Sequence, residues 1–294
     1  MFVISYYKNR KLSVSTRSTL LAVIITLFTL PVMSQVITHL EKAACEERLV
    51  TAFTQLYAET DDQQKIVKSE ALQEYFGTLL AGTDFFYYPF DSVKWAGKIT
   101  SPDKKLRIIT WNVPLSDGTH RYYGFIQYKG KKKDKPVRLF TLKDSNQDIK
   151  DPEGAVFTPE NWPGALYYDI RVMKHNSQVF YVLLGFDFND RYSNKKIIDV
   201  LFIDGNMNAR FGEPVFESPE GKMKNRVIFE YSSQAVMTLR WDARLKMIVF
   251  DHLAPIEPNL EGLYKFYGPS VSYDGYKFQR GIWKYYFDVA VRNE

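Results

Sequence analysis

The densest group of side chains that could do chemistry lies in a short polar stretch, residues 185–196, between two apolar runs. It carries Asp187, Asn189, Asp190 and Asn194, with Ser193 among them. Hard oxygen donors gathered at one tight turn are the ligands that calcium prefers. We therefore predict Asp187, Asn189 and Asp190 as the metal ligands if the protein holds calcium, and we expect no other cofactor.

The same residues also fit a purely structural turn. Asp and Asn side chains readily accept hydrogen bonds from their own backbone, which stabilises turns without any ligand. The stretch lacks the spacing, the glycine and the closing glutamate of an EF-hand loop. It also carries Arg191, Lys195 and Lys196, whose charges repel a cation. Both interpretations, calcium site and structural corner, remain open on the sequence.

A second group consists of aromatic residues near the C-terminus. Exposed rings are stacking platforms in sugar-binding proteins, so we predict a surface for a glycan or peptide made by Tyr273, Tyr276, Trp283 and Tyr285. The alternative is a β-sheet core with one exposed rim, because alternation along a strand buries only about half of the rings. Residues 264–287 hold ten aromatics: Tyr264, Phe266, Tyr267, Tyr273, Tyr276, Phe278, Trp283, Tyr285, Tyr286 and Phe287.

No motif of a known catalytic class occurs in the sequence. It has no G-x-S-x-G elbow, Walker loop, dinucleotide fingerprint or H-E-x-x-H. These absences favour a non-catalytic protein that binds or scaffolds. The alternative is a hydrolase of glycans or peptides, which would need two carboxylates roughly 5–10 Å apart. Several acids in the second half are available for such a pair: Glu213, Glu217, Glu230, Asp242, Asp251 and Glu257.

The elements that position these groups read as strands. Val179–Leu184 and Ile197–Ile203 are apolar runs with β-branched and aromatic members, which predicts two buried strands around the polar stretch. Similar runs separated by Pro, Gly, Asp and Asn turns predict a mainly β fold, an antiparallel meander that is irregularly sandwich-like or propeller-like. The predicted strands cover residues 94–100, 105–113, 120–129, 136–142, 165–173, 178–185, 196–203, 226–232, 235–241 and 245–251, with more in 271–291.

The sequence before residue 93 has a helical pattern of apolar residues in place of strand-like runs. Apolar residues recur with a helical period from Val36 to Tyr57 and again from Ile66 to Leu80, which predicts a two-helix hairpin. Thr60 and Gln63 fit a capping box for the second helix. The aromatic connector 85–90 is expected to wedge under the hairpin. We therefore divide the chain into 35–92 and a β-rich domain, 93–294, with a surface loop at 144–163 that would be the seam if the β-region divides in two.

The N-terminus has the pattern of a secretory signal peptide. Residues 1–18 carry four basic side chains and no acid, an apolar stretch of about 11 residues follows from Leu20, and Val32 and Ser34 are small residues before a cleavage site. A membrane span needs about 20 apolar residues, so an anchor is the alternative only if the segment stays uncleaved. We predict residues 1–34 as the signal peptide and a periplasmic or extracellular location.

The net charge of the chain is consistent with an exported protein. The chain carries a net charge of +5, of which the four basic residues of the signal supply most, and +1 remains for a mature chain starting near Gln35. So small a charge gives no reason to expect nucleic-acid binding. The expected partners are a glycan, a peptide or an envelope protein.

Several segments carry a resemblance to a known group of proteins. They are WNVPLSDG from Trp111, KIIDVLF from Lys196, KMIVFDHL from Lys246, and YGP from Tyr267 with YDGYKF from Tyr273. In these segments the chain resembles exported proteins of Bacteroidota that have no assigned activity, over most of residues 93–294. The resemblance implies an envelope or secreted location and adds no catalytic residue.

The signal-peptide prediction is tested by the mass of the exported protein. We expect cleavage after Ser34, so intact-mass measurement and N-terminal sequencing should find a chain that begins at Gln35. A full-length chain that stays with the membrane fraction would show instead that residues 20–33 act as an anchor.

Overall fold

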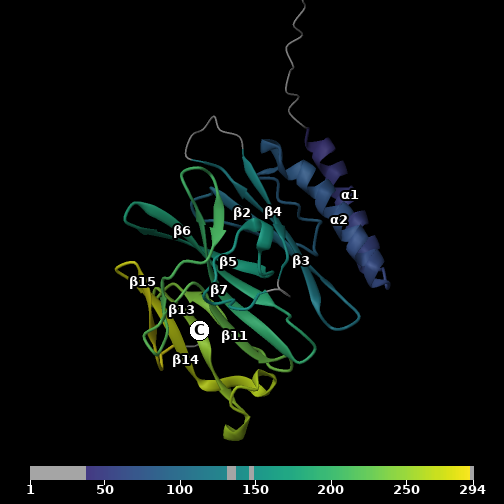
Figure 1. The fold of residues 1–294 in the computed structure, drawn as a ribbon. Coiled ribbons are helices and arrows are strands. Elements are labelled where there is room, and N and C mark those ends of the chain that lie inside the picture. The colour runs from purple at the N-terminus through teal and green to yellow at the C-terminus, as the bar shows by residue number, and fades with distance from the viewer. Residues whose placement is uncertain (1–37, 131–136, 146–148, 292–294) are drawn as a thin grey trace, which may run out of the picture. The chain divides into compact units, whose positions relative to one another are not determined.

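The mainly β architecture with an N-terminal helical hairpin is confirmed by the computed structural model (Figure 1). The structure describes residues 38–130, 137–145 and 149–291, so the predicted signal peptide lies outside the described residues. The helices are α1 (His39–Tyr57) and α2 (Asp62–Leu80), with short 3-10 turns η1 (Thr83–Phe85), η3 (Pro159–Asn161), η4 (Pro258–Leu260) and η5 (Tyr264–Phe266).

The strands form three sheets, antiparallel throughout except for one parallel pair between β9 and β15. The first sheet has the order β1 (Gly97–Thr100), β2 (Leu106–Pro114), β3 (His120–Tyr128), β4 (Arg138–Lys143). The middle sheet has the order β11 (Val227–Ser232), β7 (Ser193–Ile203), β6 (Gln178–Asp187), β5 (Leu166–His175), with β8 (Ala209–Phe211) on β7. The third has the order β10 (Met223–Lys224), β9 (Phe216–Glu217), β15 (Ile282–Tyr286), β14 (Tyr267–Gln279), β13 (Met247–Pro255), β12 (Leu239–Asp242).

Three apolar cores stack these elements into four layers. The first core joins the hairpin to one face of the first sheet, through side chains such as Phe53, Phe76 and Trp111. The second lies between the first and middle sheets and includes Ile108 and Leu183. The third lies between the middle and third sheets. In Figure 1 the strands β5, β6 and β7 accordingly lie between the helices and the β13–β15 region.

The middle sheet is covered on both faces. Successive side chains of a strand point to opposite sides, so Leu183 enters the second core and Leu184 the third. The partner strand β7 behaves alike, with Ile197 and Ile198 in opposite cores. This double burial explains why the two strands read as unbroken apolar runs rather than as an alternation of apolar and polar residues.

The hairpin is capped differently from the prediction. The second helix is capped by Asp61, whose side chain accepts a hydrogen bond from the Gln64 amide at 2.8 Å, so the predicted box at Thr60 is wrong. A true capping box opens α1, between Thr38 and Glu41. Asp61 is the better cap because it lies one residue closer to the first helical turn.

The segment 144–163 was predicted as a surface loop, and this is wrong for its second half. Phe157 and Trp162 are buried in the second core. Asp144 and Trp162 form a parallel bridge, and Phe157 bridges Phe211 at the end of β8. The Asp, Pro and Gly content signalled the turns of this segment but not the two aromatic anchors that fix it against the sheets. The predicted aromatic connector is confirmed, since Phe85 and Phe90 are buried in the first core.

Double burial of the middle sheet makes a stability prediction. Leu183→Ala and Leu184→Ala should each lower the free energy of unfolding by about 2–5 kcal/mol, because each leaves a cavity in a different core. Urea denaturation followed by tryptophan fluorescence measures both.

Leu40→Ala is the matched control, since Leu40 is 81% exposed and should change stability by less than about 0.5 kcal/mol. If only one of the two neighbouring substitutions is costly, one face of β6 is not packed.

Candidate functional site

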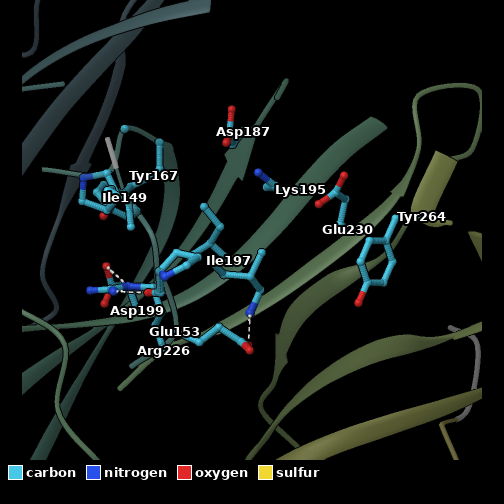
Figure 2. Close-up of a pocket in the computed structure, with 15 residues that line it drawn as sticks. Ile149, Glu153, Tyr167, Asp187, Lys195, Ile197, Asp199, Arg226, Glu230 and Tyr264 are labelled. Atoms are coloured by element: carbon cyan, nitrogen blue, oxygen red, sulfur yellow. Dashed lines mark hydrogen bonds and ion pairs between the residues drawn. The ribbon is translucent and has the colours of Figure 1, made fainter. Parts of the chain in front are cut away.

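A pocket of about 310 Å³ lies over β7 and β11, on the face of the middle sheet that carries the second core (Figure 2). The segment 149–165 forms one wall and η5 contributes to the rim. Its volume is at the lower end of the range for small-molecule sites. It is lined by Ile149, Pro152, Glu153, Pro163, Gly164, Ala165, Tyr167, Asp187, Lys195, Ile197, Asp199, Arg226, Ile228, Glu230 and Tyr264.

A row of three charged side chains crosses this face. In the strand register Lys195 of β7 lies opposite Asp187 of β6 on one side and opposite Glu230 of β11 on the other. Directly opposite residues on one face have Cβ atoms about 5 Å apart. In Figure 2 the Lys195 ammonium lies between the two carboxylates. The row presents acceptor, donor and acceptor in sequence across three strands.

The turn between β6 and β7 holds this row in place. Asp187 is buried, and its Oδ1 accepts hydrogen bonds from the Tyr122 hydroxyl at 2.7 Å and the Asn189 amide at 2.8 Å. The Asn189 side-chain oxygen accepts from Lys195 Nζ at 2.6 Å. Asp190 Oδ1 accepts from the amides of Tyr192 and Ser193. The turn is therefore fixed largely by its own backbone and side chains, as in an Asx turn.

The predicted metal ligands are not brought together as a ligand set. Asp187 accepts a hydrogen bond from Tyr122 of the first sheet, whereas Asp190 accepts one from the Ser193 amide within the turn. Within the described part of the chain, no group of three or more His, Cys, Asp or Glu side chains is arranged to hold a metal ion. The structural interpretation of Asn189 is supported by its positive φ of 48°, a conformation that Asn tolerates in turns.

A buried ion pair lies on the same face of β7, four residues along the strand from Lys195. Arg226 Nε lies 3.2 Å from Asp199 Oδ2, and the side chains are 1% and 0% exposed. Burial raises the pKa of Asp199, while the charge of Arg226 and the Val200 amide act in the opposite direction. The guanidinium lies over the Phe157 ring at 4.4 Å and donates to the Ala155 carbonyl at 3.1 Å. The pair thus ties the pocket wall to the sheet.

Glu153 anchors the same wall to the edge of the sheet. Its Oε1 accepts from the Ile228 amide at 3.1 Å, and its Oε2 from Lys224 Nζ at 2.7 Å. Its carbonyl accepts from the Asn225 amide at 2.9 Å. Edge strands expose amides that otherwise pair with other chains, and Glu153 occupies the Ile228 amide of β11. The charge of Glu153 is matched locally by Lys224, and of the acids of the row Glu230 is the more exposed.

The opposite rim is aromatic. Tyr264 of η5 is 48% exposed, and its ring packs on Tyr267 with 5.2 Å between centroids. Figure 2 shows the Tyr264 ring beside Glu230. Glu230 Oε1 is oriented by the Ser193 hydroxyl at 2.6 Å. A ring face next to an oriented carboxylate suits a ligand that has both apolar C–H faces and hydroxyl groups.

The four aromatics predicted as a ligand surface are divided by the fold. Tyr276 and Trp283 are each 1% exposed and belong to the third core. Tyr285 packs against that core, and its hydroxyl donates to Asp274. Tyr273 is half-buried on β14. None of the four lines the pocket, whereas Tyr264, at the start of the same aromatic segment, does.

Of the acids considered for a hydrolytic pair, Glu230 alone lines this pocket. Glu213 pairs with Arg210, Glu217 with Lys284 at 3.9 Å and Asp242 with Arg240 at 3.2 Å. Asp251 accepts from the Thr238 amide at 2.6 Å. His252 is oriented by Asp274, with 2.6 Å between Nδ1 and Oδ2, at a β-bulge of the third sheet away from the pocket.

Sequence reasoning missed Lys195, Asp199 and Arg226 as site residues. A signal was present. Lys195, Ile197 and Asp199 alternate on one face of a strand that is buried from Ile197 to Phe202, and charges at such positions mark a polar opening or a buried pair. From the sequence, Lys195 is interpreted only as a charge that repels calcium. The wall supplied by 149–165 comes from a distant segment and had no local signal.

Comparisons with protein-family models, curated proteins and solved structures found no match to this chain. Among the residues that the structure describes, no helix is long and apolar enough to cross a membrane. The functional argument therefore rests on the pocket itself.

The buried pair makes a prediction about the pocket wall. Arg226→Met should lower the free energy of unfolding by about 3–5 kcal/mol, because it leaves the Asp199 carboxylate buried without its partner. The midpoint of urea unfolding measures this change.

The double variant Arg226→Met, Asp199→Asn should recover a large part of the loss, since the unpaired charge is gone. If the two single losses simply add in the double variant, the pair does not act as a unit.

Proposed function

We propose that this chain is an exported binding protein whose pocket over β7 and β11 holds a glycan. The observation that carries the proposal is the row Asp187–Lys195–Glu230 beside the Tyr264 ring. Sugar hydroxyls both donate and accept hydrogen bonds, so the partly exposed donor Lys195 and acceptor Glu230 can each find a partner on one sugar, while the buried Asp187 fixes the end of the row. The aromatic rim adds a face for the C–H side of the ring.

A glycan suits this pocket better than a peptide. An extended peptide is held mainly by main-chain hydrogen bonds to a free strand edge. At the start of β11 the Ile228 amide, and just before it the Asn225 and Arg226 amides, are already bonded to Glu153, so this end of the edge is closed to a peptide strand. The recognition groups are side chains on that face. Envelope location, inferred from the N-terminal pattern, places the protein where glycans are abundant.

A second candidate function is hydrolysis of the same class of ligand. The register puts Asp187 and Glu230 two strands apart, roughly 10 Å between backbones, which is compatible with an acid pair. Against it, Asp187 is buried and bonded to Tyr122, and Lys195 lies between the two acids. Binding without turnover is therefore the function that we favour.

The binding proposal predicts selective loss on changing the row. The purified full chain is titrated calorimetrically with cellohexaose, xylohexaose, chitohexaose and hyaluronan hexasaccharide. For the sugars that bind, Glu230→Gln and Tyr264→Ala should each weaken binding by about tenfold or more. The first replaces a charged acceptor by a weaker neutral one and the second removes the stacking face, and each change costs about 1.4 kcal/mol.

Glu217→Gln is the matched control, since Glu217 lies on β9 of the third sheet, outside the pocket, and should leave binding unchanged. Binding to none of the four sugars would contradict the proposal. Release of shorter sugars during the titration, abolished by Asp187→Asn and Glu230→Gln alike, would establish the hydrolase instead.

A further inference from the structure

The pocket does not end at Glu230. Ile228 and Glu230 line it, and the next residue on the same face of β11, Ser232, lines a second, more open hollow of about 550 Å³. From Ile228 to Ser232 the strand rises about 13 Å. The two hollows therefore follow each other along one strand. A ligand that fills both must be a chain rather than a single small ring.

The short turn η5 lies between the hollows and belongs to both. Tyr264 lines the first, whereas Lys265 and Phe266 line the second. The Tyr264 ring packs on Tyr267, which also lines the second hollow. A chain that leaves the Tyr264 face therefore passes directly onto the second set of side chains.

The second hollow has the opposite charge from the first. No acid is found among the described residues that line it, and Lys265 makes no ion pair or hydrogen bond with any side chain in the described ranges. The Lys265 ammonium lies 5.9 Å from the centre of the Tyr192 ring and 5.1 Å from that of Phe266. The other cation, Arg191, is already engaged, since it donates to the Ser116 carbonyl at 2.6 Å.

Tyr192 supplies the second stacking face. It is 65% exposed on the turn between β6 and β7, which is fixed by Asp190 and by the bond from the Ser233 amide to the Tyr192 carbonyl at 2.9 Å. The hydroxyls of Ser232 and Ser233 and the Gln234 amide are close by. An exposed ring, polar side chains and a free ammonium together match a sugar that carries a carboxylate.

We propose that the ligand is an acidic oligosaccharide, with a neutral sugar at the Asp187–Lys195–Glu230 row and a uronic acid at Lys265 and Tyr192. This rests on the proposed glycan-binding function and adds the charge and length of the ligand. A glycan that is acidic at every unit fits less well, because the first pocket is lined by four carboxylates, Glu153, Asp187, Asp199 and Glu230, against two cations, Lys195 and Arg226.

The test compares charged and uncharged forms of the same sugars. Hyaluronan hexasaccharide, which alternates neutral and acidic units, and a xylohexaose with one glucuronic acid are titrated into the full chain beside their methyl esters. We expect each acid to bind at least about tenfold more tightly than its ester in dilute buffer, and the difference to shrink with added salt. Lys265→Met should reduce the acid-to-ester ratio to about 1 without weakening ester binding.

Lys174→Met is the matched control, an exposed lysine of β5 that lines neither hollow, and it should preserve the ratio. Tyr192→Ala should weaken the acid and the ester together. Esters that bind as tightly as acids, and still depend on Glu230, would overturn the acidic subsite while the glycan-binding function stands. Binding of hexaglutamate in place of the sugars would overturn the glycan assignment. If no sugar binds at all, both proposals fall.

Discussion

The rest of the structure depends on a sheet that has no face open to water over most of its area. The strands β6 and β7 are packed between two cores, so each polar group on them must find a partner inside the protein. Asp199 forms an ion pair with Arg226, Asp187 accepts a hydrogen bond from Tyr122, and Lys195 donates one to Asn189. Those partners come from the residue before β11, from β3 and from the β6–β7 turn. The need to satisfy a few charges on a buried sheet thus determines where distant segments attach.

The pocket arises where that coverage ends. The first sheet packs over β5 and β6, and beyond it the face of β7 and β11 carries the segment 149–165, with Tyr264 of η5 at the rim. Gly164, with a φ of 74°, turns this segment back toward β5, and a side chain there would collide with the Tyr122 ring. Burial raises the pKa of Tyr122, and its hydroxyl donates to Asp187 and also accepts from the Phe188 amide at 2.8 Å. Pocket wall and pocket floor are therefore built on one shared tyrosine.

Most of the fold was predictable from sequence because its signals are local. Apolar runs bounded by turn residues placed the major strands within a few residues, and helical periodicity placed the hairpin. Two local details were wrong for physical reasons: Asp61 outcompetes Thr60 as the cap, and Phe157 and Trp162 draw a polar loop into a core. The stacking of three sheets was not predictable, because it depends on which apolar faces meet after the strands have formed.

The site was predictable only in part for the same reason. The turn between β6 and β7 stood out by its composition. Composition does not reveal that Asp190 accepts hydrogen bonds from two amides of the turn, whereas Asp187 accepts one from Tyr122 of the first sheet. The decisive neighbours, Lys195 with Glu230 and Tyr264 with Lys265, are set by register and by a 3-10 turn far along the chain. Once the register is known, the two hollows beside β11 differ in charge: the first is lined by Glu230 and other acids, and the second by Lys265. That order spans both hollows, and it would give the proposed ligand a direction.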